Sequence, residues 1–234
     1  KVYQIKGDKL NKIKVINGCM NTKDLIDLAH YYNTTLTGFI VSIYILAIKE
    51  NMNLKDENKY IYIDIPVNLR KYFKSQTARN FFSVIKIKYN GSNNLEDIIK
   101  YVDKTLKQEL KKDNLFKTMN KYAIFEHNFL IRLIPLFIKN YILKLITKFI
   151  KTTTTVTNLG VIKVNDSLKD YIDNFEVYVS TNKMQISVCS YLDKLNISFT
   201  SIFESMDIIK DFYRKLSKFG INIIITTNKI EGTA

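Results

Sequence analysis

The sequence predicts an α/β protein, a two-layer sandwich in which helices cover a mixed β-sheet. Of its 234 residues 46% are hydrophobic, with 15 Tyr and 14 Phe, so the chain can bury a sizeable core. Segments with strand and helix periodicity follow one another without strict alternation. Only 7 Gly and 2 Pro are present, and no linker separates two parts. These observations exclude disordered and Pro-rich classes, and we expect residues 1–234 to form a single domain.

The first fifth of the chain predicts two short strands and two helices. Residues 2–6 and 13–17 have strand character around a Gly-Asp turn, and Thr22 is the expected cap of the first helix. The second helix begins after Thr35 and is apolar on nearly every side. Such a helix is expected at the centre of the core.

The middle of the chain predicts a pair of strands and then helices. Residues 59–68 and 81–89 alternate between apolar and polar side chains, and Asn90-Gly91 closes the second strand. Helical spacing of apolar residues follows over 95–112, 115–128 and 130–151.

The last third predicts mainly strands, with a tight turn at Asp193-Lys194 and one helix over 205–219. We expect the strands that start at Lys59 and Phe81 to share one sheet with 185–192 and 194–200. The helices that start at Thr35 and Leu95 are expected to cover it. The five strands of this third are predicted at 153–164, 175–180, 185–192, 194–200 and 221–227.

The net charge is +14, from 36 Lys and Arg against 22 Asp and Glu. Only four of the 36 are Arg and the other 32 are Lys, while Asn, Ile and Tyr are also abundant, as an AT-rich coding bias produces. The lysines are spread along the whole chain instead of forming one basic patch. We therefore expect nucleic acid not to be the partner, despite the charge.

The two cysteines, Cys19 and Cys189, are far apart and neither belongs to a C-x-x-C pair. This spacing predicts neither a disulfide framework nor a zinc site and fits a reducing, cytoplasmic compartment. The chain starts at Lys1 without Met or an apolar leader, so we expect a fragment of a longer protein without a signal peptide. No run of about 18 apolar residues predicts a membrane span.

Common catalytic motifs are missing from the sequence. It has no G-x-G-x-x-G, no phosphate-binding loop, no H-E-x-x-H and no G-x-S-x-G. Neither His30 nor His127 has an acidic residue one helical turn downstream, and adjacent Glu126 and His127 point in different directions on a helix. The sequence therefore offers no convincing general base.

Residues 65–82 stand out because they hold one of the two prolines and two of the four arginines, Arg70 and Arg79. Arg offers a planar fork that binds a carboxylate with two hydrogen bonds, which Lys cannot do. The segment therefore predicts either a functional site that needs this geometry or a strand end whose Arg clamps a nearby acidic loop. Residues alone leave both readings open.

The helix expected over 130–151 combines a wide apolar face with several lysines on the other side. An interfacial membrane helix and a helix that covers a sheet share this pattern. We favour the sheet-covering helix, since an apolar stripe is the usual mark of core packing.

The motifs P-V-N-L-R at 66–70 and R-N-F-F at 79–82 resemble a strand and loop of the chloramphenicol-acetyltransferase-like superfamily, which includes nonribosomal-peptide condensation domains and alcohol acetyltransferases. The stretch 28–37 resembles the helix before that strand, and T-N-L-G at 157–160 resembles the S-N-L-G strand that follows the family's helical insert. Residues 175–177, 185–191 and 194–200 follow in the family's order. The resemblance covers nearly the whole chain, matches the carboxy-terminal half of the family, and is closest to the alcohol-acetyltransferase-like branch.

The resemblance implies a division of labour between two halves. Family members carry an H-H-x-x-x-D motif in the amino-terminal half, where the second His is the general base on an acceptor hydroxyl or amine that attacks an acyl thioester. This chain has no such motif, so no catalytic residue is expected in it. By resemblance, Arg70 holds the motif's Asp across the halves, Asn158 lines the cleft, and Asn80 sits where the loop returns to the sheet.

Two functions follow as expectations. The first is the carboxy-terminal domain of an O-acyltransferase that uses acyl-CoA or an acyl-carrier thioester as co-substrate, with an alcohol or amine acceptor, no covalently bound cofactor and no metal. Its partner would be the missing half that carries H-H-x-x-x-D. The alternative is a non-catalytic module that binds a protein, a membrane surface or a polyanion through a Lys-rich face, and peripheral membrane contact stays open in both. Upstream coding sequence would discriminate the two.

Overall fold

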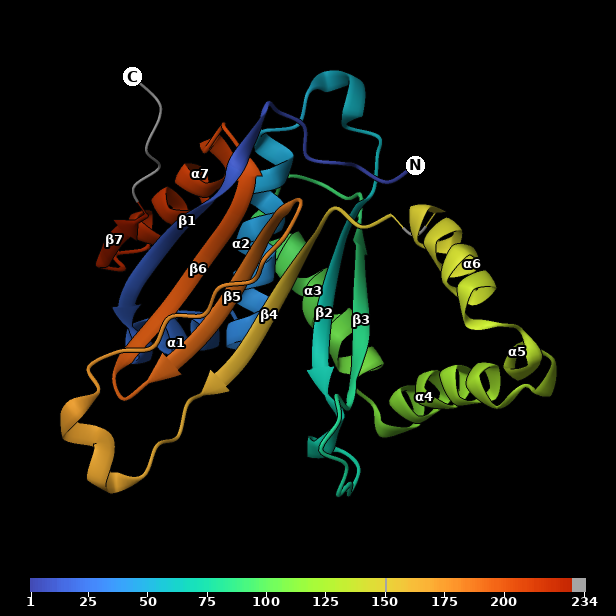
Figure 1. Ribbon diagram of the computed structural model, residues 1–234. Coiled ribbons are helices and arrows are strands. Elements are labelled where there is room, and N and C mark those ends of the chain that lie inside the picture. Colours follow the sequence, from blue (N-terminus) through green and yellow to red (C-terminus); the bar gives the residue numbers. More distant parts are fainter. Residues whose placement is uncertain (150, 229–234) are drawn as a thin grey trace.

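The computed structural model describes residues 1–149 and 151–228 and confirms the predicted α/β sandwich. One mixed sheet has the strand order β3-β2-β4-β5-β6-β1-β7, and Figure 1 shows α1, α2, α3 and α7 on one of its faces. β4 runs parallel to both β2 and β5, and the other neighbours are antiparallel. The strands are β1 (Lys9–Asn21), β2 (Ile61–Asn68), β3 (Phe82–Tyr89), β4 (Thr154–Val161), β5 (Met184–Tyr191), β6 (Lys194–Phe203) and β7 (Ile223–Thr227).

Helices and strands mostly begin and end within a few residues of the predicted positions. β4 joins β2 and β3 to β5 and β6, so the predicted single sheet is confirmed. The α-helices are α1 (Thr22–Tyr31), α2 (Leu36–Glu50), α3 (Leu95–Glu109), α4 (Lys112–His127), α5 (Phe129–Leu133), α6 (Leu136–Phe149) and α7 (Asp207–Lys218); the short 3-10 turns are η1 (Leu54–Asp56), η2 (Leu69–Lys71) and η3 (Asp166–Tyr171).

Helix α2 is the centre of the core, as its all-round apolar sequence predicts. The hydroxyl of Thr35 accepts a hydrogen bond from the Gly38 amide and caps the helix, and every residue from 38 to 48 is buried. The Tyr44 ring packs edge-on against Phe199 of β6 and Phe212 of α7, which joins both layers. An apolar helix of this kind needs cover on all sides, and the sheet, α3 and α7 provide it.

The predicted strand over 2–6 is wrong. Val2 forms only an isolated bridge with Tyr60, and the Tyr3 amide donates to the Tyr60 carbonyl at 2.8 Å. β2 has no free edge beyond that point, because the Thr153 amide already donates to the Tyr62 carbonyl at 2.9 Å. The N-terminal segment therefore ends its pairing after one bridge.

The predicted strand over 175–180 is also wrong. These residues have no strand partner and cross the face of the sheet opposite the helices. Both edges of β5 are occupied by β4 and β6, so an added strand would find no free backbone groups there. The segment is instead held through contacts such as the bond from the Asn17 side chain to Glu176 Oε1, at 2.9 Å.

Two local predictions were off by one residue. Asn21, not Thr22, caps α1, since its side-chain oxygen accepts from the amides of Lys23 and Asp24. The β5–β6 turn is Leu192-Asp193, because Lys194 already pairs with Tyr191, and Leu192 adopts a left-handed φ of 53°.

The predicted single helix over 130–151 is wrong in continuity and in position. Pro135 separates α5 from α6, because proline has no amide hydrogen and disfavours helical geometry in the residue before it. Figure 1 shows α4, α5 and α6 extending away from the sheet, so α6 does not cover it. Ile150 lies outside the described residues.

Candidate functional site

The residues singled out in the sequence lie at one end of the sheet. β2, β4 and β5 are parallel, so their carboxyl ends meet at the same edge. There η2 and the loop 72–81 follow β2, while Asn158 belongs to the last part of β4 and η3 comes after it. We call residues 68–81 and 158–171 together the rim; Figure 1 shows it at the lower end of the sheet.

The two parts of the rim lie on strands that separate. β2 and β4 pair only at Ile63 with Thr154 and at Asp64 with Thr155, although both strands continue toward the rim. Figure 1 shows β2 and β3 diverging from β4 beyond this point. Arg70 therefore follows a strand that diverges from the strand of Asn158, and the sheet does not bring the two side chains into contact.

Arg70 is exposed on η2 and organises the loop that follows it. Its Nη2 donates to the carbonyl oxygens of Thr77, at 2.9 Å, and Arg79, at 2.6 Å. The Asn68 side chain accepts from the Arg70 amide at 3.0 Å and fixes the start of η2. The guanidinium therefore holds the loop 72–81 through backbone carbonyls.

No acidic side chain pairs with Arg70 among the described residues. Asp64 lies 3.5 Å from Lys86 Nζ, and Asp173 pairs with Lys194 at 2.6 Å. The loop that Arg70 holds contains no acidic residue. The alternative prediction, that Arg70 clamps an acidic loop, is therefore wrong. Arg70 reaches the surface with part of its hydrogen-bonding capacity unused.

Asn80 and Asn158 occupy different settings. Asn80 is exposed at the end of the Arg70 loop, and no hydrogen bond among the described residues involves its side chain. Asn158 is half-buried and donates to Thr37 Oγ1 of α2 at 2.9 Å, while its oxygen accepts from the Gly160 amide at 2.8 Å. Gly160 has a φ of +74° beside a shift in strand register, a conformation that suits glycine. Asn158 thus locks the turn of β4 onto the start of α2.

The rim is strongly basic on the β2 side, and the catalytic motifs considered in the sequence did not predict this cluster. Between Asp64 and Glu96 the sequence contains no acidic residue but six Lys or Arg. Arg70, Lys71, Lys74 and Arg79 are all exposed there. The acid-free stretch is readable from the sequence. Such a cluster attracts anionic groups of a ligand.

The described residues supply no general base at the rim. Its two ranges contain neither His nor Cys. His30 is exposed on α1, and no described hydrogen bond or ion pair involves its imidazole, while the side chain of His127 lies outside the described residues. On η3, a hydrogen bond from Lys169 lowers the pKa of the Asp166 carboxyl, which makes that carboxylate a weaker base.

The cysteines are also poor nucleophiles. Burial raises the pKa of the Cys19 and Cys189 thiols above the ordinary value, so both stay protonated at neutral pH. Cys189 Sγ also donates to the Phe175 carbonyl at 3.1 Å. Within the described part of the chain, no group of three or more His, Cys, Asp or Glu could hold a metal ion.

A groove of about 970 Å³ lies at the β7 edge of the sheet, where α7 meets β1 and β7. It is lined by Ile209, Tyr213, Ile223 and Ile225, among others, and by none of the three predicted site residues. The rim, and not this groove, is therefore where the sequence-predicted residues gather.

No family model matches the sequence, and no curated protein matches it. Solved structures do match its fold. An epimerization domain of tyrocidine synthetase B has a TM-score of 0.57 at 16% identity, with 92% of this chain and 50% of that chain covered. The trichothecene 15-O-acetyltransferase TRI3 of Fusarium sporotrichioides has a TM-score of 0.56 at 12% identity, covering 94% and 48%.

A wax ester synthase/diacylglycerol acyltransferase of Marinobacter aquaeolei VT8 has a TM-score of 0.54 at 13% identity, covering 92% of this chain and 51% of that chain. The chain thus spans about half the length of these three proteins. The resemblance inferred from the sequence is confirmed at the level of the fold: the chain folds like about half of this epimerization domain and of these two acyltransferases.

Proposed function

We propose that this chain is the carboxy-terminal half of a thioester-dependent O-acyltransferase of the alcohol-acetyltransferase type. The observation that carries the proposal is the exposed rim, where Arg70 holds a basic loop but meets no acid among the described residues. A half-length acyltransferase fold with an Arg that faces outward fits a clamp to a second half. Two of the neighbours are named as an O-acetyltransferase and a wax ester synthase, which supports transfer to oxygen.

In the proposed mechanism the second half provides the His base. That base takes the proton of an acceptor hydroxyl or amine, the acceptor attacks the thioester carbonyl, and the thiolate leaves and is protonated. This chain positions the parts. Arg70 binds the Asp of the base's motif with its remaining guanidinium hydrogens and keeps the loop 72–81 in place.

The basic loop has a second task in this proposal. Lys71, Lys74 and Arg79 are exposed beside Arg70 and attract the phosphates of coenzyme A or of a carrier's pantetheine arm. Asn158, anchored by Thr37, gives the opposite wall a fixed shape. We propose that a small alcohol or amine is the acceptor and that no metal takes part.

The test is an assay of the longer polypeptide encoded by the gene, with acetyl-CoA and a series of alcohols, in which release of free coenzyme A is measured. We expect transfer by the longer polypeptide and none by residues 1–234 alone. Arg70→Ala should abolish transfer, and Arg70→Lys should restore little of it because Lys lacks the planar fork. Transfer by residues 1–234 alone, lost in His30→Ala or His127→Ala, would overturn the proposal.

A binding experiment on this chain tests the phosphate task separately. The double variant Lys74→Glu with Arg79→Glu should weaken calorimetric binding of coenzyme A. Lys210→Glu with Lys218→Glu is the matched control, since it changes the net charge equally at exposed positions of α7. Equal weakening by both variants would assign binding to overall charge and contradict a rim site.

A further inference from the structure

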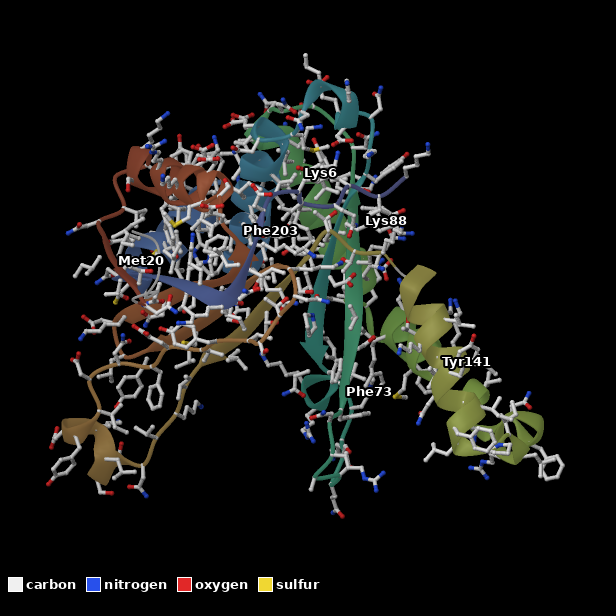
Figure 2. The ribbon with its side chains drawn as sticks, turned by 45° about the horizontal axis from the view of Figure 1, so that its top comes forward. Lys6, Met20, Phe73, Lys88, Tyr141 and Phe203 are labelled. Atoms are coloured by element: carbon white, nitrogen blue, oxygen red, sulfur yellow. The ribbon has the colours of Figure 1, made fainter. Side chains whose placement is uncertain are left out.

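Helix α6 carries an apolar face that the protein does not bury. Phe137, Ile138, Tyr141, Ile142 and Leu145 repeat at helical spacing along one side, with exposed fractions of 74%, 39%, 65%, 40% and 39%. Figure 2 shows Tyr141 on the projecting helices, away from the sheet. A contiguous exposed face of large apolar side chains marks a binding surface.

The preceding helix extends this surface. Phe129 and Leu133 of α5 are exposed at 70% and 63%, and Leu136 at the start of α6 at 72%. Pro135 lies between the two helices and sets the bend. We call residues 129–149 the arm.

The charge of this region has one sign. From residue 127 to residue 165 the sequence has no Asp or Glu, while Arg132, Lys139, Lys144, Lys148 and Lys151 lie within or just after the arm. By helical spacing, Lys139 lies off the apolar face. Lys144 follows Phe137 by seven residues and lies at the border of that face, so cationic side chains flank the apolar face of α6 on both sides. This arrangement is typical of helices that lie in a membrane interface.

We propose that the arm binds the surface of an anionic lipid bilayer, with the apolar face of α6 in the interface and the lysines at the lipid headgroups. α6 has 14 residues, about 21 Å at 1.5 Å per residue, too short for a bilayer core of about 30 Å. Among the described helices, no single one is long and apolar enough to cross a membrane. The helix therefore lies along the surface.

Other occupants fit the same features less well. A second copy packed arm to arm would bring two acid-free cationic segments together, and like charges repel. Nucleic acid would use the lysines but would leave Phe137 and Ile142 in water. An anionic bilayer satisfies both the apolar face and the charge.

The first experiment uses the absence of Trp from the sequence. A Tyr141→Trp variant has a single indole, whose emission reports its surroundings. We expect the emission to move to shorter wavelength on vesicles of phosphatidylcholine mixed with phosphatidylglycerol, with quenching by brominated lipid. Tyr31→Trp, at a position exposed by 78% on α1, is the matched control and should not shift.

The second experiment measures vesicle partitioning of the unlabelled protein. Phe137→Ser with Tyr141→Ser should lower the partition coefficient by about tenfold or more, since apolar burial drives interfacial binding. Ile224→Ser with Ile225→Ser, at exposed positions of β7, is the apolar control. Lys139→Glu with Lys144→Glu should also lower the partition coefficient by about tenfold. Lys210→Glu with Lys218→Glu, on α7, should lower it much less.

Three outcomes would overturn the proposal. The first is an indole emission of the Tyr141→Trp variant that does not change when vesicles are added. The second is an equal decrease of the partition coefficient in the arm variants and in the control variants. The third is a dimer, detected by sedimentation and abolished by Phe137→Ser, in a protein that does not bind lipid. None of these measurements depends on acyl transfer. Failure here would leave the proposed function standing, and failure of the transfer assay would leave the lipid surface standing.

Discussion

Helices α2 and α6 have nearly equal lengths, 15 and 14 residues, and similar apolar side chains, yet their surroundings are opposite. α2 has no charged residue between Leu36 and Ile48 and is packed on all sides. α6 carries three lysines, at 139, 144 and 148, and exposes its apolar face. The comparison teaches that apolar residues at helical spacing indicate a surface on which the helix packs. The charged residues among them indicate how many sides of the helix can be covered in this way.

The same contrast separates the body of the molecule from the rim and the arm. In the body, the side chains are packed against other parts of the same chain. At the rim and on the arm, basic and large apolar side chains are exposed. Substitutions should therefore have large effects on folding in the body and small effects on folding at the rim and on the arm.

The largest expected effect comes from a pair of phenylalanines. Phe39→Ala on α2 removes a ring that is 0% exposed and stacks with Tyr32, and should cost about 3 to 5 kcal/mol of unfolding free energy. Phe137→Ala, at 74% exposure on α6, should cost less than about 0.5 kcal/mol. Urea denaturation checks both, and similar costs would break the comparison between α2 and α6.

Gly18 tests the close packing of the body. A Cβ built at this position would lie 2.4 Å from Tyr213 Cε1, and Tyr213 is buried with its hydroxyl bonded to the Ile197 carbonyl at 2.6 Å. The ring cannot move without losing that bond. Gly18→Ala should therefore cost about 1 to 3 kcal/mol by denaturation, and Gly160→Ala, which meets no atom within 4 Å but has a φ of +74°, should cost about 1 kcal/mol through backbone strain. A neutral Gly18→Ala would contradict tight packing here.

Asp56 gives the body a pH dependence. Hydrogen bonds from Lys59 and Lys6 lower the pKa of its carboxyl, whose side chain is 4% exposed. A lowered folded-state pKa stabilises the protein above the unfolded pKa near 4, and this stabilisation is lost as pH falls through the folded value. Asp56→Asn should lower the melting temperature at pH 7 and flatten its decline below about pH 4.

Asp166 is the matched control for this pH effect. Lys169 likewise lowers the pKa of its carboxyl, but the side chain is 89% exposed and solvent screens the pair. Asp166→Asn should leave the melting curve against pH nearly unchanged. An equal change in both variants would show that burial does not distinguish them.

The smallest effect on folding is expected at Arg70. Its guanidinium is exposed and bonds two loop carbonyls, so Arg70→Ala should change the stability of this chain by less than about 1 kcal/mol. In the longer polypeptide, loss of a buried ion pair should cost about 3 to 5 kcal/mol and transfer activity. Strong destabilisation of residues 1–234 alone would assign Arg70 a purely structural role.

Local patterns predicted much of this architecture. The apolar sequence after Thr35 predicted the central helix, and alternation in 59–68 and 81–89 predicted the β2–β3 pair. The residues 66–70 and 157–160 predicted the fold through resemblance. Arg70 was predicted at a strand end and Asn158 in a cleft between two halves. The structure places both at one end of the sheet, and their function as a site remains a prediction.

Long-range competition decided what the patterns could not. Residues 175–180 have strand character, yet β4 and β6 already occupy both edges of β5. Residues 2–6 likewise find only one free position beside β2, at Tyr60, because Thr153 already bonds Tyr62. Strand formation requires a free edge, and whether an edge is free depends on residues far away in sequence.

The sequence by itself determined the helix and strand periodicity, the acid-free basic segments 65–95 and 127–165, and the missing general-base motif. Only the tertiary structure decided that Arg70 clamps backbone carbonyls, that β2 and β4 separate after two pairs, and that α6 faces solvent. The reason is physical: side-chain chemistry and spacing are local properties, whereas burial depends on which surfaces the rest of the chain has already covered.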